Sequence, residues 1–150
     1  MKKTMLVVVT FFGLMVCVGQ SLARTIDTAS TTLAAMDQTA LIAKWGIRAE
    51  RMMISGAGNI VDFRYHVLDP EKAAKVVSPK IKPVLVDEKT GMMKEVPMPA
   101  NIGALRNTGR NLKKDRKYFV LFNNPGRNIK KGDKVTLVMG DYKLEHIEVQ

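Results

Sequence analysis

Few side chains in this sequence are of the types that catalyse reactions. The chain has two histidines, His66 and His146, and a single cysteine, Cys17. Acid–base and nucleophilic catalysis need such groups beside a paired acid, base or nucleophile. No Gly-x-Ser-x-Gly, His-Glu-x-x-His or phosphate-binding loop occurs, and the acidic residues are scattered singly apart from Asp87-Glu88. We therefore expect a non-catalytic protein without a cofactor, with an enzyme of unknown class as the remaining alternative.

A second set of side chains could hold a metal ion. Thioether sulfur and imidazole nitrogen are ligands that copper accepts, and residues 92–98 carry three methionines around a turn. Methionine is also a common gap-filler in hydrophobic cores. A periplasmic copper carrier is therefore an alternative function. Its candidate ligands are His66, Met92, Met93, Met98 and His146.

Positive charge is concentrated late in the chain. The formal net charge is +10, and residues 106–134 hold ten basic side chains against Asp115 and Asp133. Such a surface attracts anionic partners by long-range electrostatics. We predict that one basic face binds an acidic protein or an anionic envelope component; a merely solubilising surface is the alternative. The candidate contacts, in or beside residues 107–117 and 123–131, are Arg106, Arg110, Lys113, Lys114, Arg116, Lys117, Arg127, Lys130 and Lys131.

Nucleic acid is not an expected partner of this basic surface. Proteins that hold single strands stack the bases on aromatic side chains between the charges. Aromatic residues are not interleaved with the basic ones here. An exported chain would also work away from nucleic acid.

The strand predicted over residues 59–68 organises the remaining elements. Apolar and polar residues alternate along it, and this two-residue period is typical of a strand with one buried face. Its polar positions are Asp62, Arg64 and His66, which we take as a second candidate binding surface. Asp62 and Arg64 could equally form an ion pair that contributes only about 0.2–1 kcal/mol.

Further strands are predicted on both sides of this one. Residues 45–55 form its hairpin partner, with Trp45, Ile47, Ala49 and Met53 on one face. A short helix begins at the N-cap Asp69. Strands follow at 81–86, with Pro83 suggesting an edge, and at 92–96, 118–122, 134–139 and 142–149.

About seven short strands with frequent turns predict an all-β fold. We expect an antiparallel immunoglobulin-like β-sandwich with one short helix. A small β-barrel is the alternative, because periodicity does not report closure.

The N-terminus has the pattern of a secretory signal peptide. Lys2 and Lys3 precede an apolar run over residues 5–18, and small residues lie at the −3 and −1 positions before a cleavage point after Ala23. The run is shorter than the roughly 20 residues of a membrane span. We predict a periplasmic or secreted protein with no membrane span after cleavage.

Cleavage would leave one domain without cysteine. Loss of Lys2 and Lys3 lowers the formal charge from +10 to +8, and loss of Cys17 excludes disulfides and thiolate metal sites. We expect a signal peptide at 1–23, a flexible and partly helical tether at 24–44, and a β-sandwich domain at 45–150.

Several strings of this chain resemble a family of small secreted bacterial proteins of unknown function. They are Trp45-Gly46-Ile47-Arg48, residues 61–65 and 67–74, Asn124-Pro125-Gly126, and Lys131-Gly132-Asp133-Lys134-Val135. The last of these, with its hairpin, also resembles the final strands of bacterial immunoglobulin-like domains. The resemblance implies a secreted β-domain and carries over no catalytic residue.

Overall fold

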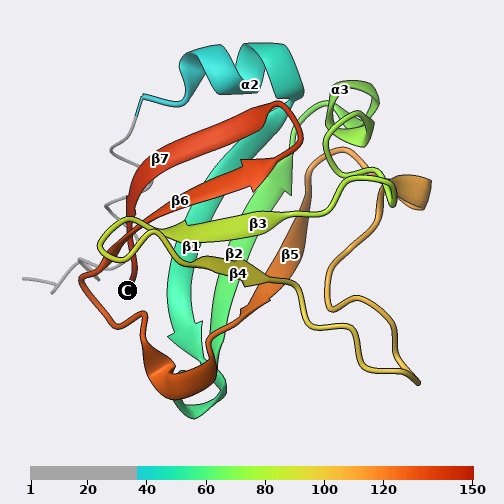
Figure 1. Cartoon of the computed structure of the whole chain (residues 1–150). Helices are drawn as coiled ribbons and strands as arrows, with labels where there is room; N and C mark the ends of the chain where they lie inside the picture. The colour runs from blue at the N-terminus through green and yellow to red at the C-terminus, as the bar shows by residue number, and fades with distance from the viewer. Residues whose placement is uncertain (1–36) are drawn as a thin grey trace, which may run out of the picture.

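The computed structural model describes residues 37–150, which form two antiparallel β-sheets lying face to face (Figure 1). The three-stranded sheet has the order β1 (Ile47–Ser55), β2 (Ile60–Val67) and β5 (Arg116–Asn123). The four-stranded sheet has the order β4 (Met93–Glu95), β3 (Val84–Asp87), β6 (Lys134–Met139) and β7 (Tyr142–Glu148). The predicted seven-stranded β-sandwich is confirmed, and these strands do not close into a barrel. The order is that of a constant-type immunoglobulin sandwich whose fourth strand has moved to the other sheet.

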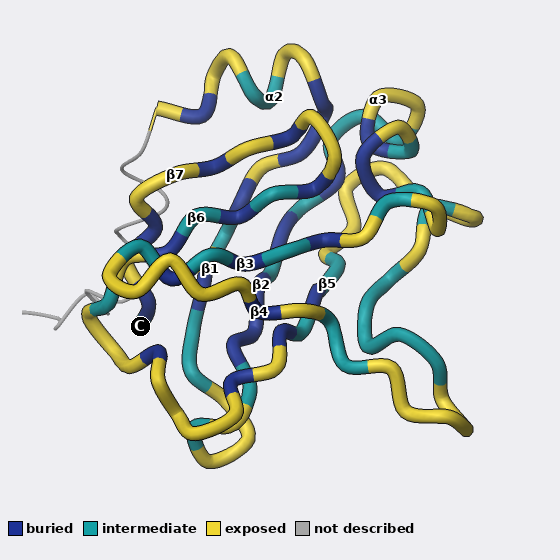
Figure 2. Tube along the Cα trace, viewed as in Figure 1, coloured by how far each residue is buried: buried dark blue, intermediate teal, exposed yellow. Residues whose placement is uncertain are grey.

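The core lies between the two sheets and follows from the alternation along β2. Val61, Phe63, Tyr65 and Val67 are all 0% exposed, as their two-residue spacing predicts. They belong to one cluster with the inward side chains of β3, β6 and β7. Figure 2 shows buried residues recurring along the strands of both sheets, whereas most turns and loops are exposed. Strand β2, at the centre of the three-stranded sheet, therefore supplies the main apolar face of that layer.

The hairpin partner β1 differs from its prediction in two ways. Trp45 is buried as expected, but it ends helix α2 (Thr39–Trp45) and does not begin the strand. A shift in register between Ala49 and Arg51 leaves Glu50 as an extra residue. Such a bulge reverses the side-chain alternation beyond it. Met52 is therefore in the core, whereas Met53, predicted to share the face of Ala49, is not.

The outer edge of β1 finds its hydrogen-bond partners outside the strands. The buried Gln38 amide accepts a bond from the Ala49 N–H (2.7 Å) and donates one to the Ala49 carbonyl (3.2 Å). Further along, Gln150 exchanges backbone bonds of 2.9 Å with Met52 and Ile54. These contacts satisfy buried backbone groups that an unpaired edge would leave without partners.

Short helices complete the fold between strands. Helix α3 (Pro70–Ala74) begins as predicted, because the Asp69 carboxylate accepts bonds from the N–H groups of Glu71 and Lys72. The prediction that Pro83 marks an edge strand was wrong: β3 begins after it, at Val84, and lies between β4 and β6. Single 3-10 turns are η2 (Gly56–Gly58), η3 (Gly109–Asn111) and η4 (Pro125–Arg127).

The predicted signal peptide and most of the predicted tether lie outside the described residues. Helix α2 occupies the end of that tether segment. Within residues 37–150, no helix is both long and apolar enough to cross a bilayer.

Gly46 joins α2 to β1 at a position that requires glycine. Its φ is +63°, and a Cβ there would lie 2.6 Å from both the Cβ and the carbonyl oxygen of Asp69. Gly46→Ala should lower the free energy of unfolding by about 3 kcal/mol or more, because left-handed strain and a backbone clash add together. Gly91→Ala is the matched control, since its φ is +71° with no atom within 4 Å. It should cost only about 1 kcal/mol. Equal losses in urea denaturation would contradict the clash.

Candidate functional site: a basic end and an adjoining cleft

Two segments far apart in sequence meet at one end of the sandwich. The Gly109 N–H donates to the Val77 carbonyl (2.9 Å), and the Asp115 N–H donates to the Val67 carbonyl (2.8 Å). We call residues 67–82 and 106–117 the basic end. It holds ten basic side chains against three acidic ones. The basic side chains are Lys72, Lys75, Lys80, Lys82, Arg106, Arg110, Lys113, Lys114, Arg116 and Lys117.

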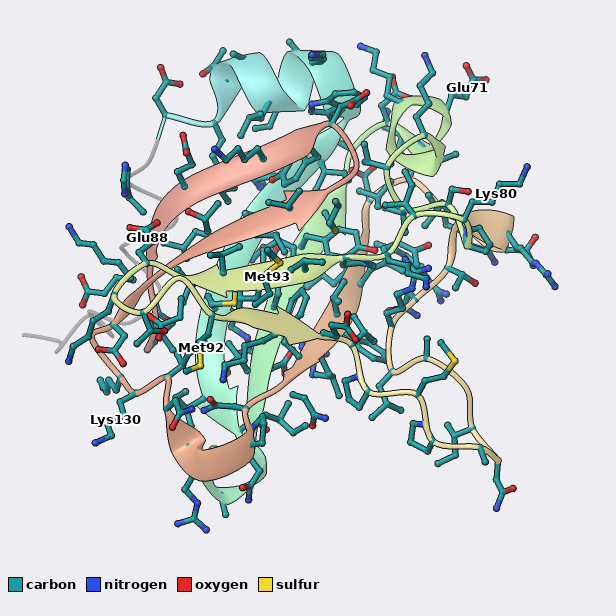
Figure 3. The ribbon with its side chains drawn as sticks, viewed as in Figure 1. Glu71, Lys80, Glu88, Met92, Met93 and Lys130 are labelled. Carbon is teal, nitrogen blue, oxygen red and sulfur yellow. The ribbon has the colours of Figure 1, made fainter. Side chains whose placement is uncertain are left out.

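The structure divides the predicted basic face into two parts. Six of its nine residues lie in the basic end, whereas Arg127, Lys130 and Lys131 follow the opposite end of β5. Six residues of β5, 118–123, lie between the two groups, about 20 Å of extended chain. Figure 3 shows Lys80 and Lys130 on opposite sides of the molecule. The nine predicted residues therefore do not form one rim.

Sequence reasoning missed the lysines of residues 72–82. They follow β2, and the other six basic residues precede or begin β5. Since β2 and β5 are antiparallel neighbours, the end of one lies beside the start of the other. A prediction that these two strands pair would have placed the lysines of residues 72–82 beside residues 106–117.

Most cations of the basic end have no carboxylate partner among the described residues. Only Lys72, 3.7 Å from Asp69, and Lys117, 3.0 Å from Glu50, form ion pairs. Arg110, Lys113, Lys114 and Arg116 are exposed and unpaired. Uncompensated charges in one region produce a positive potential that reaches into solvent.

The second predicted surface, the polar face of β2, is occupied by internal contacts. Arg64 donates to both oxygens of the buried Asp62, through Nε (2.8 and 2.9 Å) and Nη2 (2.8 Å). Its guanidinium also lies over the Phe119 ring, 5.3 Å from the centroid. His66 Nδ1 lies 3.0 Å from Arg48 Nη2. The Asp62–Arg64 pair lies along β2, whereas the contacts with Arg48 and Phe119 reach the neighbouring strands. Together they leave few donors or acceptors for a ligand.

The candidate copper ligands are distributed over both sheets. His66 is on the three-stranded sheet, whereas Met92 and Met93 lie at the β3–β4 turn of the other, where Figure 3 labels them. Met93 and Met98 are 72% and 71% exposed. Among residues 37–150, no three His, Cys, Asp or Glu side chains gather as metal ligands would. The structure does not bring the five candidates to one point.

A cleft of about 540 Å³ adjoins the basic end. It lies between the β3–β4 side of one sheet and the segment 104–108, which runs beside β5. Seven of its twelve lining residues are apolar, and three of these are prolines. The lining residues are Pro79, Lys82, Pro83, Val84, Glu95, Val96, Pro97, Met98, Ala104, Arg106, Thr108 and Asn123. This volume lies in the range of small-ligand and peptide sites.

Comparison with known proteins finds no relative of this chain. The chain matches no protein-family model, no curated protein and no solved structure. The resemblance to a secreted bacterial family therefore stays a prediction.

His146, the last candidate ligand, is held by Glu88 in the β3–β4 turn. The Glu88 carboxylate accepts bonds from the Thr136 hydroxyl (2.7 Å) and the His146 N–H (2.8 Å), and it lies 2.9 Å from His146 Nδ1. Burial raises the pKa of Glu88, but these hydrogen bonds outweigh burial and hold the pKa below its ordinary 4.5. The His146 backbone has a φ of +57°, in the left-handed region that side chains disfavour. The Glu88 carboxylate therefore stabilises an unfavourable backbone conformation.

Glu88→Gln should therefore destabilise the protein in a pH-dependent way. At pH 7 we expect the free energy of unfolding to fall by about 1–2 kcal/mol, since hydrogen bonds to a charged acceptor are lost. A depressed pKa stabilises the folded state above the unfolded-state pKa, and that stability is lost as the pH falls through the lower folded value. The difference between variant and wild type should thus shrink below a pH of about 4.5. Urea denaturation at several pH values, with Glu148→Gln as an exposed control, measures it; a pH-independent loss would contradict it.

Proposed function

We propose that this protein is a non-catalytic binding module that engages an acidic protein through its basic end. The observation that supports the proposal is the meeting of residues 67–82 and 106–117, which concentrates ten basic side chains against three acidic ones. Complementary charge accelerates association and orients the partner before contact. Among residues 37–150, only Lys72 and Lys117 of this group form an ion pair, so most of these cations are available to an external carboxylate.

An acidic protein suits the basic end better than a lipid surface does. Proteins that lie on membranes combine basic residues with apolar side chains that enter the bilayer. The exposed large apolar side chains of the described residues are Met92, Met93, Met98 and Ile102. None of them belongs to residues 67–82 or 106–117, although Met98 lines the adjoining cleft. Electrostatic attraction without such anchors favours a hydrated, carboxylate-rich partner.

The absence of a catalytic role is part of the same proposal. Three histidine–carboxylate contacts occur among the described residues: His146 with Glu88, and His66 with Glu50 and with Asp115. None of these side chains lines the described cleft beside the basic end. An active site ordinarily places such groups in a concave pocket. The leader-like pattern at residues 1–23 supports action in the periplasm or outside the cell.

Two charge-reversal variants of equal net charge test the proposal. One replaces Arg110, Lys113 and Lys114 of the basic end by Glu, and the control replaces Lys89, Lys130 and Lys131, which lie outside it. All six side chains are exposed and without ion pairs among the described residues. Binding of a glutamate-rich peptide, measured by thermophoresis, should weaken at least about tenfold in the first variant and far less in the control. Affinity should also fall steeply as salt rises.

Three outcomes would overturn this proposal. Equal weakening in both variants would mean that net charge alone attracts the peptide. No weakening in either would remove the basic end from binding altogether. Selective loss of binding to phosphatidylglycerol vesicles, with peptide binding unchanged, would identify a lipid surface as the partner.

A further inference from the structure

The cleft beside the basic end has the dimensions of a site for an extended chain. Its wall on one side runs from Ala104 to Thr108, four residue steps, or about 13 Å of extended backbone. This segment pairs with β5 through bonds from the Leu121 N–H to the Leu105 carbonyl (3.0 Å) and from the Asn107 N–H to the Phe119 carbonyl (3.1 Å). The opposite wall is formed by Val84, the first residue of β3, by Glu95 at the end of β4, and by the residues that follow β4. The cleft therefore lies along the corner where the edges of the two sheets approach.

Arg106 is a cation held in this apolar cleft. One of its terminal nitrogens, Nη2, donates to the carbonyls of Pro79 (3.0 Å) and Ser78 (3.4 Å), which orient the guanidinium. No carboxylate among the described residues forms an ion pair with it. Partial burial lowers the pKa of Arg106, while neighbouring Tyr65 acts in the opposite direction. The two carbonyls leave the positive charge of Arg106 without a counter-ion, and a carboxylate is the planar anion that accepts hydrogen bonds from a guanidinium fork.

The rim of the cleft exposes apolar surface and an open strand edge. Met98 is 71% exposed, and Ile102, at the tip of the adjoining loop, is 75% exposed. Strand β4 is the last of its sheet and pairs only with β3. Pro97 and Pro99 follow it and have no N–H to donate, so the open edge offers backbone pairing over only a few residues. Figure 1 shows the loop after β4 standing away from the sheets at the lower right.

We propose that this cleft binds a short extended peptide segment in which a carboxylate pairs with Arg106 and neighbouring apolar side chains pack against Val84 and Val96. This inference rests on the proposed function and names the part of the acidic partner that is recognised. Backbone pairing to β4 would add to affinity, as in other proteins that extend a sheet edge with a peptide. Lys82 and Glu95, on the same lining, favour a segment with one principal acid over a uniformly acidic one.

The pairing of a carboxylate with Arg106 is tested by a double-mutant cycle on synthetic peptides. Short peptides that each carry one Glu among Val, Ile and Leu are first screened for the tightest binder. The same peptide with Gln in place of Glu is the second ligand of the cycle. Arg106→Gln should weaken the Glu peptide about tenfold and leave the Gln peptide nearly unchanged. Arg106→Lys, which keeps the charge and loses the fork, should lie between. Equal effects on both peptides would overturn the pairing.

Filling the cleft provides a second test that does not remove a hydrogen bond. Ala104 lines the cleft on its loop side, so Ala104→Trp should block entry of the peptide and abolish binding, with melting temperature as the check of folding. Amide signals of residues 93–96 should shift on peptide addition to the wild type. Wild-type affinity in Ala104→Trp would overturn the cleft as the site and leave the proposed function standing. If the peptide requires the cleft but binds the triple reversal of Arg110, Lys113 and Lys114 normally, the proposed function fails instead.

Discussion

The mutual burial of two sheet faces is the constraint on which this structure depends. Cys17 is the only cysteine, so no disulfide within the chain can hold the sheets together. The inner face of β2 is completely buried, from Val61 to Val67, against the inward residues of the other sheet. Apolar burial of this kind contributes about 25 cal/mol per Å² and must offset the ordering of the chain. The strict alternation of β2 then obliges its polar side chains to face outward.

Because the polar side chains of β2 must face outward, they form a network of ion pairs and hydrogen bonds on the outer face of the three-stranded sheet. Asp62 faces the side of the sheet away from the core yet is only 5% exposed, and such a carboxylate needs partners. The fork of Arg64 supplies them. The bulge at Glu50 adds a second carboxylate on this face, within 3.0 Å of Lys117. The polar face of β2 is thus part of how the sheet is stabilised, which is why it makes a poor surface for a ligand.

The edges of the two sheets are treated differently. At the edge of β1, the Gln38 amide and the Gln150 backbone form hydrogen bonds with the strand's backbone groups. At the edge of β5, the segment 105–107 does the same. β4 keeps an open edge, shortened to three residues and followed by prolines. Brevity and proline protect an edge from unwanted pairing with other chains. A short open edge beside a cleft can still select one extended segment.

The basic end and the cleft would act on a partner at different distances. Exposed lysines and arginines act over the distance of the Debye length, about 8 Å at physiological salt, and affect the rate of encounter. Arg106 acts only at contact, because its guanidinium is fixed by two carbonyls and reaches the cleft from a partly buried position. Arg106 belongs to both regions. The proposed partner would therefore be oriented by the basic end first, and its carboxylate would then pair with Arg106 in the cleft.

Much of the fold follows from local sequence patterns. The period along residues 59–68, the cap at Asp69 and the turn residues between strands predict seven strands and one helix, because alternation, capping and turn chemistry act over a few residues. The bulge at Glu50 and the central position of β3 could not be predicted in this way. They depend on which strands pair and in what register, which is decided between distant residues.

The candidate site shows the same division. The sequence by itself determined that the chain is basic, and that the charge between residues 106 and 117 stands near a predicted strand. Only the tertiary structure decided that Lys72 to Lys82 join it while Arg127, Lys130 and Lys131 do not. The antiparallel pairing of β2 with β5 brings the end of one strand to the start of the other. The net charge follows from the residue types alone. Which cations share one surface depends on strand pairing, and the pairing depends on how the apolar faces of the strands are buried against one another.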